Sequence, residues 1–178
     1  MNTNHILISG PSASGKTTLI RNLLKNYKSL SFSVSHTTRP RREGEVDGKD
    51  YHFITVDDFL SLIKNGKILE YTIFNGNYYG TSFSELSSKI PKIFDVEYEG
   101  VLHFKNNFPY FKFIFIDCDK ETIKGRLSNR GDKEKDIEAR LKLYDKFQEI
   151  KGEFDKIVMN NKSIEEGLKE IVEYLKLD

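Results

Sequence analysis

The sequence predicts an α/β fold of three layers, in which a parallel sheet lies between two layers of helices. Apolar runs of strand length alternate with stretches that carry apolar residues at helical spacing, and this alternation favours a parallel sheet covered on both faces. A glycine-rich segment, Gly10–Thr17, separates the first apolar run from the first helical stretch. Between about residue 36 and residue 90, strand patterns and turn residues predict a β-rich lobe inserted into this core.

Composition and charge indicate one globular domain with a sizeable core. The chain has 178 residues, of which 31% are charged and 38% hydrophobic, and its net charge is +1. This balance gives no indication of a nucleic-acid or membrane partner, and no segment resembles a transmembrane helix or a secretory signal. The single cysteine, Cys118, excludes an intrachain disulfide and suits a reducing compartment, so we expect a cytoplasmic protein. Cys118 ends an apolar run and is expected in the core.

The first element is the apolar run Ile6-Leu7-Ile8, which predicts a buried strand. The segment after it, Gly10 to Thr17, fits the pattern glycine, four residues, Gly-Lys-Ser/Thr, which is typical of a phosphate-binding P-loop. Small residues let successive backbone N–H groups surround a phosphate, and the positive end of the following helix dipole points at the same place. Lys16 is expected to reach the outer phosphates, and the Thr17 hydroxyl to bind Mg²⁺.

The remaining elements follow from periodicity, capping residues and turn residues. Asn75-Gly76, between two strand patterns, predicts a hairpin turn with positive φ. Before residue 92 the patterns predict a helix at Thr18–Lys25, strands at Leu30–Ser35, Tyr51–Ile54 and Ile68–Ile73, a loop at Thr37–Asp50 and a helix capped by Thr55. After it they predict strands at Lys92–Tyr98, Phe111–Ile116 and Lys156–Met159, and helices at Gly100–Asn107, Thr122–Asn129 and Ile137–Lys151, with a last helix capped by Ser163.

The inserted lobe carries residues suited to a second phosphate group. Arg39 and Arg42 share one loop, and Tyr51 and the pair Tyr78-Tyr79 follow in the lobe. Arginine binds phosphate oxygens bidentately, and tyrosine hydroxyls add neutral donors. The alternative is a solvated basic loop with tyrosines that pack in a core.

Glu70 interrupts a strand that is otherwise largely apolar. A carboxylate can accept hydrogen bonds from both the ring N–H and the exocyclic amino group of guanine, an arrangement that adenine does not offer. The alternative is a glutamate on the solvent face of a strand.

A third group consists of Arg126, Arg130 and Arg140 on a charged, helical segment. Phosphoryl transfer needs positive charge around the moving group and exclusion of water, and arginines on a closing segment supply both. The alternative is that these are ordinary arginines on helix surfaces.

Together these residues resemble the guanylate kinase family, over nearly the whole chain from Ile6 to about Leu175. The motifs that carry the resemblance are Ser9-Gly10-Pro11-Ser12, Ser33-Val34-Ser35, Thr37-Thr38-Arg39, Gly44-Glu45-Val46-Asp47-Gly48, Asp50-Tyr51, Glu70, Gly76-Asn77-Tyr78-Tyr79-Gly80-Thr81, Arg126-Leu127, Arg130-Gly131 and Asn160. The chain departs from the family at Glu97-Tyr98-Glu99-Gly100, where the family usually has Asp, an apolar residue, Gln and Gly. The segment Thr81–Lys92 is also shorter than in typical members and lacks the arginine often found after the Gly-Thr pair.

The resemblance implies an enzyme that transfers the γ-phosphoryl group of ATP to GMP, and also to dGMP, with Mg²⁺. It implies one domain over residues 1–178, with a core (1–35, 92–125 and 152–178), a GMP-binding lobe (about 36–90) and a short helical lid (about 126–150). The implied catalytic residues are Lys16, Arg39, Arg130 and Arg140. The implied ATP-binding residues are Gly10, Pro11, Ser12, Ala13, Ser14, Gly15, Lys16, Thr17, Thr18, Arg126 and Asn160, with Thr17 on the metal. The implied GMP-binding residues are Ser35, Arg39, Arg42, Tyr51, Glu70, Tyr79, Thr81 and Glu97.

The resemblance also implies a monomer or weak dimer whose partners are the two nucleotides. Two other functions stay open from the sequence. The first is a catalytically weak, guanylate-kinase-like module that binds phosphopeptides, and the second is a P-loop kinase for another small molecule. The presence of Lys16 and Thr17 disfavours the first, and Glu70 with the arginine and tyrosine set disfavours the second.

Overall fold

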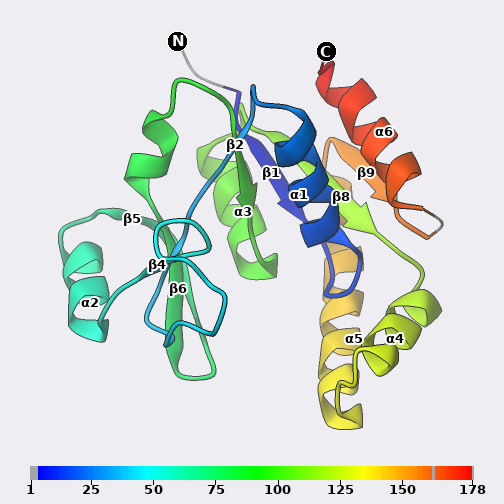
Figure 1. The fold of residues 1–178 in the computed structure, drawn as a ribbon, viewed down its shortest axis with the longest axis horizontal. Coiled ribbons are helices and arrows are strands. Elements are labelled where there is room, and N and C mark those ends of the chain that lie inside the picture. The colour runs from blue at the N-terminus through cyan, green and yellow to red at the C-terminus, as the bar shows by residue number, and fades with distance from the viewer. Residues whose placement is uncertain (1–3, 162, 178) are drawn as a thin grey trace.

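The computed structural model of the chain describes residues 4–161 and 163–177, which form two separate sheets (Figure 1). The larger sheet is parallel and five-stranded, in the order β2-β7-β1-β8-β9. Its strands are β2 (Ser31–Phe32), β7 (Lys92–Asp95), β1 (Ile6–Ser9), β8 (Lys112–Asp117) and β9 (Lys156–Met159). The predicted α/β fold with a parallel core sheet is confirmed.

The two faces of this sheet are packed with different kinds of side chain. Alternate residues of a strand point to opposite faces, and the face that carries Ile6, Ile8 and Ile114 packs aliphatic residues against α1 (Lys16–Asn26) and α6 (Ile164–Leu175). The other face is aromatic. Leu7, Phe94, Phe113 and Phe115 pack there against α3 (Tyr98–Asn107) and α5 (Glu134–Glu149). This gives the three predicted layers.

The second sheet has four strands in the order β4-β3-β6-β5 and forms the lobe at the left of Figure 1. The strands are β3 (His36–Thr37), β4 (His52–Phe53), β5 (Ile68–Phe74) and β6 (Asn77–Ser82); α2 (Val56–Lys64) and the short helix η1 (Phe83–Ser87) flank them. The predicted hairpin turn is confirmed, since Asn75 and Gly76 have φ values of 48° and 74°. The buried Phe59 of α2 packs on Tyr78, with ring centroids 5.1 Å apart.

Helices α4 (Lys120–Asn129) and α5 form a hairpin at the lower right of Figure 1, whereas the lobe lies at the left. Its small core contains Ile123, Leu127 and Ile137, together with Cys118. Cys118 is fully buried, as the sequence predicts for a core residue. Ala13 of the loop after β1 packs against the same cluster, so the hairpin rests directly on that loop.

Three predicted elements differ from the structure by three residues at one end. Only Ser31–Phe32 of the predicted strand 30–35 join the parallel sheet, because the chain then crosses to the second sheet, where the N–H of His52 donates to the carbonyl of Ser35. The predicted strand 92–98 ends at Asp95, and α3 begins at Tyr98. The predicted helix 137–151 begins at Glu134 and ends at Glu149, before a single 3₁₀ turn.

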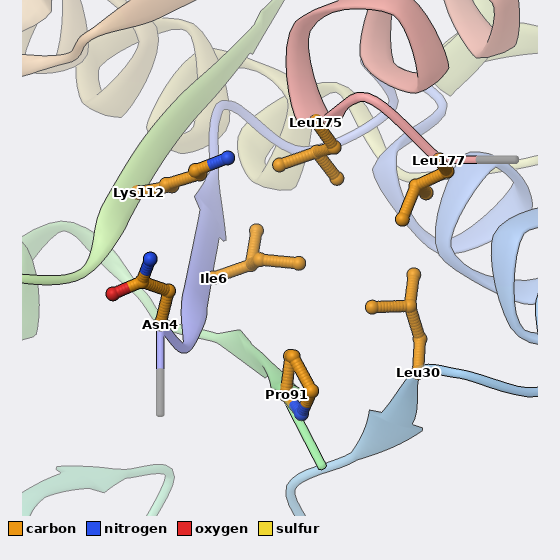
Figure 2. A pocket seen from close by; sticks show the side chains of 7 residues that line it. All are labelled: Asn4, Ile6, Leu30, Pro91, Lys112, Leu175 and Leu177. Atoms are coloured by element: carbon orange, nitrogen blue, oxygen red, sulfur yellow. The ribbon is translucent and has the colours of Figure 1, made fainter. Parts of the chain in front are cut away.

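The two ends of the parallel sheet have different character. The glycine-rich loop leaves the carboxyl end of β1, where ligands of open α/β sheets bind. A small pocket lies at the amino end, between the start of β1 and the end of α6 (Figure 2). Lys112 is the one charged residue among those that line it. None of the described helices combines the length and the apolar character that crossing a bilayer requires.

We predict that His5 makes the fold sensitive to acid. Its ring is 1% exposed, and its Nδ1 accepts the N–H of Lys92 at 3.0 Å, so the proton lies on Nε2, 3.3 Å from the carbonyl of Leu86. Burial lowers the pKa of His5 below its ordinary value of 6.5. The unfolded chain therefore takes up the proton more readily, and the free energy of unfolding falls as the pH drops below about 6.5.

Urea denaturation between pH 7.5 and 5.5 measures this dependence. His5→Asn keeps an acceptor near Nδ1 and does not titrate, so it should flatten the pH dependence of the unfolding free energy. The exposed His103, changed to Asn, should leave that slope as in the parent. Equal slopes in the parent and in His5→Asn would contradict the assignment.

Candidate active site

The loop from Gly10 to Thr17 joins β1 to α1 and lies tightly against two neighbouring strands. A Cβ on Gly10, whose φ is 150°, would lie 2.2 Å from the carbonyl oxygen of Ile116 in β8. A Cβ on Gly15, whose φ is 92°, would lie 2.1 Å from Nδ2 of Asn160, just after β9. Glycine is therefore needed at both positions, and Gly15 caps the N-terminus of α1. The loop main chain and the start of α1 form a site for an anion.

Lys16 is the cation of this first anion site. Its side chain is 11% exposed, and its ammonium group binds the carboxylate of Asp95 at the end of β7. Burial alone would lower the pKa of Lys16, but the nearby carboxylates of Asp95 and Glu97 outweigh it and raise the pKa. Lys16 therefore stays positively charged across the physiological pH range.

Arg126 and Asn160, both predicted on the ATP side, lie against the main chain of the loop. Arg126 donates to the carbonyls of Ala13 (3.1 Å) and Asn160 (2.9 Å). The buried side chain of Asn160 donates from Nδ2 to the carbonyl of Ser14 at 2.6 Å. These bonds hold the loop from the side of β9 and α4.

Three residues predicted to read a base lie together in the second sheet. Glu70 and Thr81 are partners across β5 and β6, and Oγ1 of Thr81 donates to Oε1 of Glu70 at 2.8 Å. The hydroxyls of Ser35 and Thr81 are 3.3 Å apart. Burial raises the pKa of Glu70, while its hydrogen bonds with Thr81 oppose this shift. Glu70 faces the interior rather than solvent, which favours the base-reading hypothesis over a surface glutamate.

The residues predicted to hold a second phosphate surround Arg39. Its guanidinium lies 5.6 Å from the ring centre of Tyr51, whose ring is 6.0 Å from that of Tyr79. Glu45 binds Arg39 bidentately, at 3.0 and 2.7 Å, and this hydrogen bonding lowers the pKa of Glu45 to about 2. Arg42 differs from the rest: its backbone N–H donates to Glu45, and its side chain is exposed.

The two anion sites converge at Tyr51. Burial raises the pKa of Tyr51, and Asp95 and Tyr79 raise it further, so this phenol, which lies beside Arg39, also feels the charge of Asp95. Tyr51 in turn adds to the field at Lys16. Desolvation also raises the pKa of Glu97, which Lys16 opposes, so Glu97 belongs to the same region.

Of the two arginines predicted for the lid, Arg140 contacts the loop, and Arg130 is joined to it through Asp132. Nη1 of Arg140 donates to Oγ of Ser12 at 2.7 Å, which connects α5 to the first anion site. Arg130 and Arg140 both bind Asp132, in the turn between α4 and α5. These contacts distinguish them from surface arginines without partners.

Comparisons with known proteins agree along the whole chain. A family model described as guanylate kinase matches residues 2–177. The guanylate kinase of Lactococcus lactis is 38% identical over 176 residues, which cover 94% of this chain and 86% of that relative. The guanylate kinase of Schizosaccharomyces pombe is 38% identical over 176 residues, covering 93% of this chain and 87% of that relative.

The chain belongs to the guanylate kinase family. The crystal structure of guanylate kinase from Anaplasma phagocytophilum has a TM-score of 0.75 and 28% identity, covering 98% of this chain and 86% of that one. A sugar kinase from Janibacter sp. HTCC2649, at 15% identity and a TM-score of 0.58, shares the fold alone. The predicted family, fold class and guanylate kinase activity are confirmed.

The sequence-based prediction assigns no role to three carboxylates of the site: Asp95, Glu45 and Asp132. Each binds a predicted cationic residue. Asp95 is the acidic residue that ends an apolar strand, which is a recognisable pattern for a group at the ligand edge of a parallel sheet. Glu45 belongs to a family motif, but its distance of six residues from Arg39 does not indicate pairing.

We predict that Asn160 stabilises the loop. Asn160→Ala removes the donor to the carbonyl of Ser14 and leaves that buried acceptor unsatisfied, at a cost of about 1–3 kcal/mol. Thermal and urea denaturation of the nucleotide-free protein measure this loss. Asn129→Ala, at an exposed position of α4, is the control. If Asn160 served only to contact a nucleotide base, the variant would keep the parent stability and lose ATP affinity alone.

Proposed function

We propose that this guanylate kinase transfers the γ-phosphoryl group of ATP directly to the phosphate of GMP or dGMP, using the two converging anion sites. The observation that supports this division is that Tyr51, 5.6 Å from the Arg39 guanidinium, also interacts electrostatically with Lys16 and Asp95. Two phosphate groups bound at these sites would face each other. A phosphate oxygen of GMP is already anionic, so the transfer needs no general base and no covalent enzyme intermediate.

ATP binds on the glycine-rich side. Main-chain N–H groups from the second half of the loop, residues 15–18, and the N-terminus of α1 hold its phosphates, and Lys16 adds a charge. Arg126 and Asn160 shape the adenine side of this site while they hold the loop. The Thr17 side chain is at the exposed start of α1, next to Lys16.

Mg²⁺ is the cofactor in this proposal. A hydroxyl on Thr17, at the end of the loop, and a carboxylate on Asp95, at the end of β7, are the oxygen ligands that Mg²⁺ prefers. An ion held by them would supply positive charge to the phosphates of ATP.

GMP binds to the second sheet. The carboxylate of Glu70 accepts from the ring N–H and the amino group of guanine, while Ser35 and Thr81 orient it through the hydroxyl chain described above. Glu97 offers a further acceptor toward the same nucleotide. Arg39, Tyr51 and Tyr79 donate to its phosphate, with Arg42 adding charge from the loop.

Arg130 and Arg140 of the α4–α5 hairpin are catalytic residues in this proposal. Their positive charges stabilise the phosphoryl group during its transfer. A buried, free Cys118 suits a reducing compartment such as the cytoplasm.

A coupled ADP assay with GMP, dGMP, AMP, CMP and UMP as acceptors tests the proposed substrates. ADP should form with the two guanine nucleotides and depend on Mg²⁺. Equal rates with all five acceptors would remove the assignment of Glu70.

We predict that Lys16→Met lowers kcat by about 10²-fold or more, because it removes a charge on the phosphates in the transition state. GMP affinity should change little, since Lys16 lies in the other anion site. Initial rates of ADP formation and calorimetric titration with GMP separate the two effects. Loss of GMP binding in Lys16→Met would contradict the division of the sites.

We predict that Glu70→Gln raises the KM for GMP by roughly 10- to 100-fold, because an amide N–H faces a guanine donor. The KM for ATP should stay within twofold. Because burial raises the pKa of Glu70, the parent should lose GMP affinity on mild acidification, and Glu70→Gln should lose this dependence. The exposed Glu43, changed to Gln, is the matched control. Unchanged GMP binding in Glu70→Gln would refute the role of this carboxylate.

A further inference from the structure

One carboxylate joins the two arginines of the α4–α5 hairpin. Asp132 accepts two hydrogen bonds from Arg130, from Nε at 2.7 Å and from Nη2. Its Oδ2 lies 3.2 Å from Nε of Arg140. Arg140 also donates from Nη1 to Oγ of Ser12 at 2.7 Å. A continuous polar chain therefore runs from the glycine-rich loop through Arg140 and Asp132 to Arg130.

The main chain fixes Asp132 in this place. Arg130 ends α4, and Gly131 follows with a φ of 85°, a left-handed conformation that turns the chain back. The N–H of Asp132 then donates to the carbonyl of Leu127 at 3.2 Å. The side chain of Asp132 is 14% exposed, against 52% for Arg130 and 38% for Arg140. The carboxylate is thus the more enclosed and better-held member of the group.

Asp132 does not use every N–H donor of the two arginines. Arg140 uses Nε for Asp132 and Nη1 for Ser12, and Arg130 uses Nε and Nη2 for Asp132. Among the contacts of the described residues, Nη2 of Arg140 and Nη1 of Arg130 have no hydrogen-bond acceptor. Each arginine therefore has one terminal amino group that neither Asp132 nor Ser12 uses, and the contact with Ser12 places that of Arg140 beside the loop.

We propose that Asp132 is a positioning residue for phosphoryl transfer, which holds Arg130 and Arg140 as one pre-arranged pair at the edge of the P-loop. Two guanidinium groups that converge on one phosphoryl group repel each other, and a carboxylate between them offsets this repulsion. A fixed pair also loses less side-chain freedom when the transition state forms. The inference rests on the proposed roles of Arg130 and Arg140.

The test compares Asp132→Asn and Asp132→Glu with the parent in steady-state kinetics. Asp132→Asn removes the charge and one acceptor, so kcat should fall at least tenfold while the KM for GMP stays within twofold. Asp132→Glu keeps the charge and should recover part of the loss. Asp136→Asn makes the same change in charge at an exposed position of α5 and should keep the parent kcat.

A second measurement shows whether Asp132 acts through the arginines. In the Arg130→Ala/Arg140→Ala background, measured by end-point product formation, adding Asp132→Asn should change the rate by less than twofold. The proposal is overturned if Asp132→Asn keeps the parent kcat, or if its loss persists in full without the arginines. Thermal midpoints and calorimetric GMP binding show that each variant is folded.

The outcomes separate this inference from the function on which it rests. If the arginine double variant keeps the parent kcat, the assigned roles of Arg130 and Arg140 fail, and the role of Asp132 fails with them. If the double variant loses activity and Asp132→Asn does not, only the inference on Asp132 fails.

Discussion

The close packing of the glycine-rich loop against β8 and the end of β9 is the constraint on which the rest of the site depends. Side chains at Gly10 and Gly15 would overlap the carbonyl of Ile116 and the amide of Asn160, so the loop keeps this position only with glycine at both sites. Glycine at these two positions is what lets the loop pass so close to β8 and Asn160. Asn160 and Arg126 secure the same loop through its carbonyls, and Lys16 emerges from it toward Asp95.

Four cationic side chains of the site are each held by a carboxylate. Lys16 binds Asp95, Arg39 binds Glu45, and the two arginines of the α4–α5 hairpin share Asp132. These pairs fix long side chains that would otherwise lose conformational entropy when a nucleotide binds. Glu45 orients Arg39 beside Tyr51, and Asp132 orients Arg140 beside Ser12, so the pairs set direction as well as charge.

Local sequence patterns predict the helices, the strands and the residue types of the site. They do not predict which residues from distant segments of the chain contact each other. The P-loop, the Asn75-Gly76 turn and the caps at Thr55 and Ser163 depend on neighbouring residues, and these are as the sequence predicts. The strand at Leu30–Ser35 was predicted too long, because its end is set by Glu85, whose carboxylate accepts the N–H of Val34 across 51 residues of sequence. The position of Asn160 beneath the loop likewise depends on the order of strands in the sheet, which single-sequence periodicity does not contain.

The pairing of Arg39 with Glu45 also bears on how nucleotides reach the enzyme. A carboxyl group with a pKa of about 2 stays ionised near neutral pH, so this guanidinium is accompanied there by a negative charge. The field of such a pair decays faster with distance than that of a lone cation, and the whole chain carries a net charge of only +1. Long-range electrostatic attraction of GMP is therefore weak, and the rate of association should depend little on ionic strength. Discrimination between GMP and smaller anions then arises at short range, from the fit of the base and phosphate together.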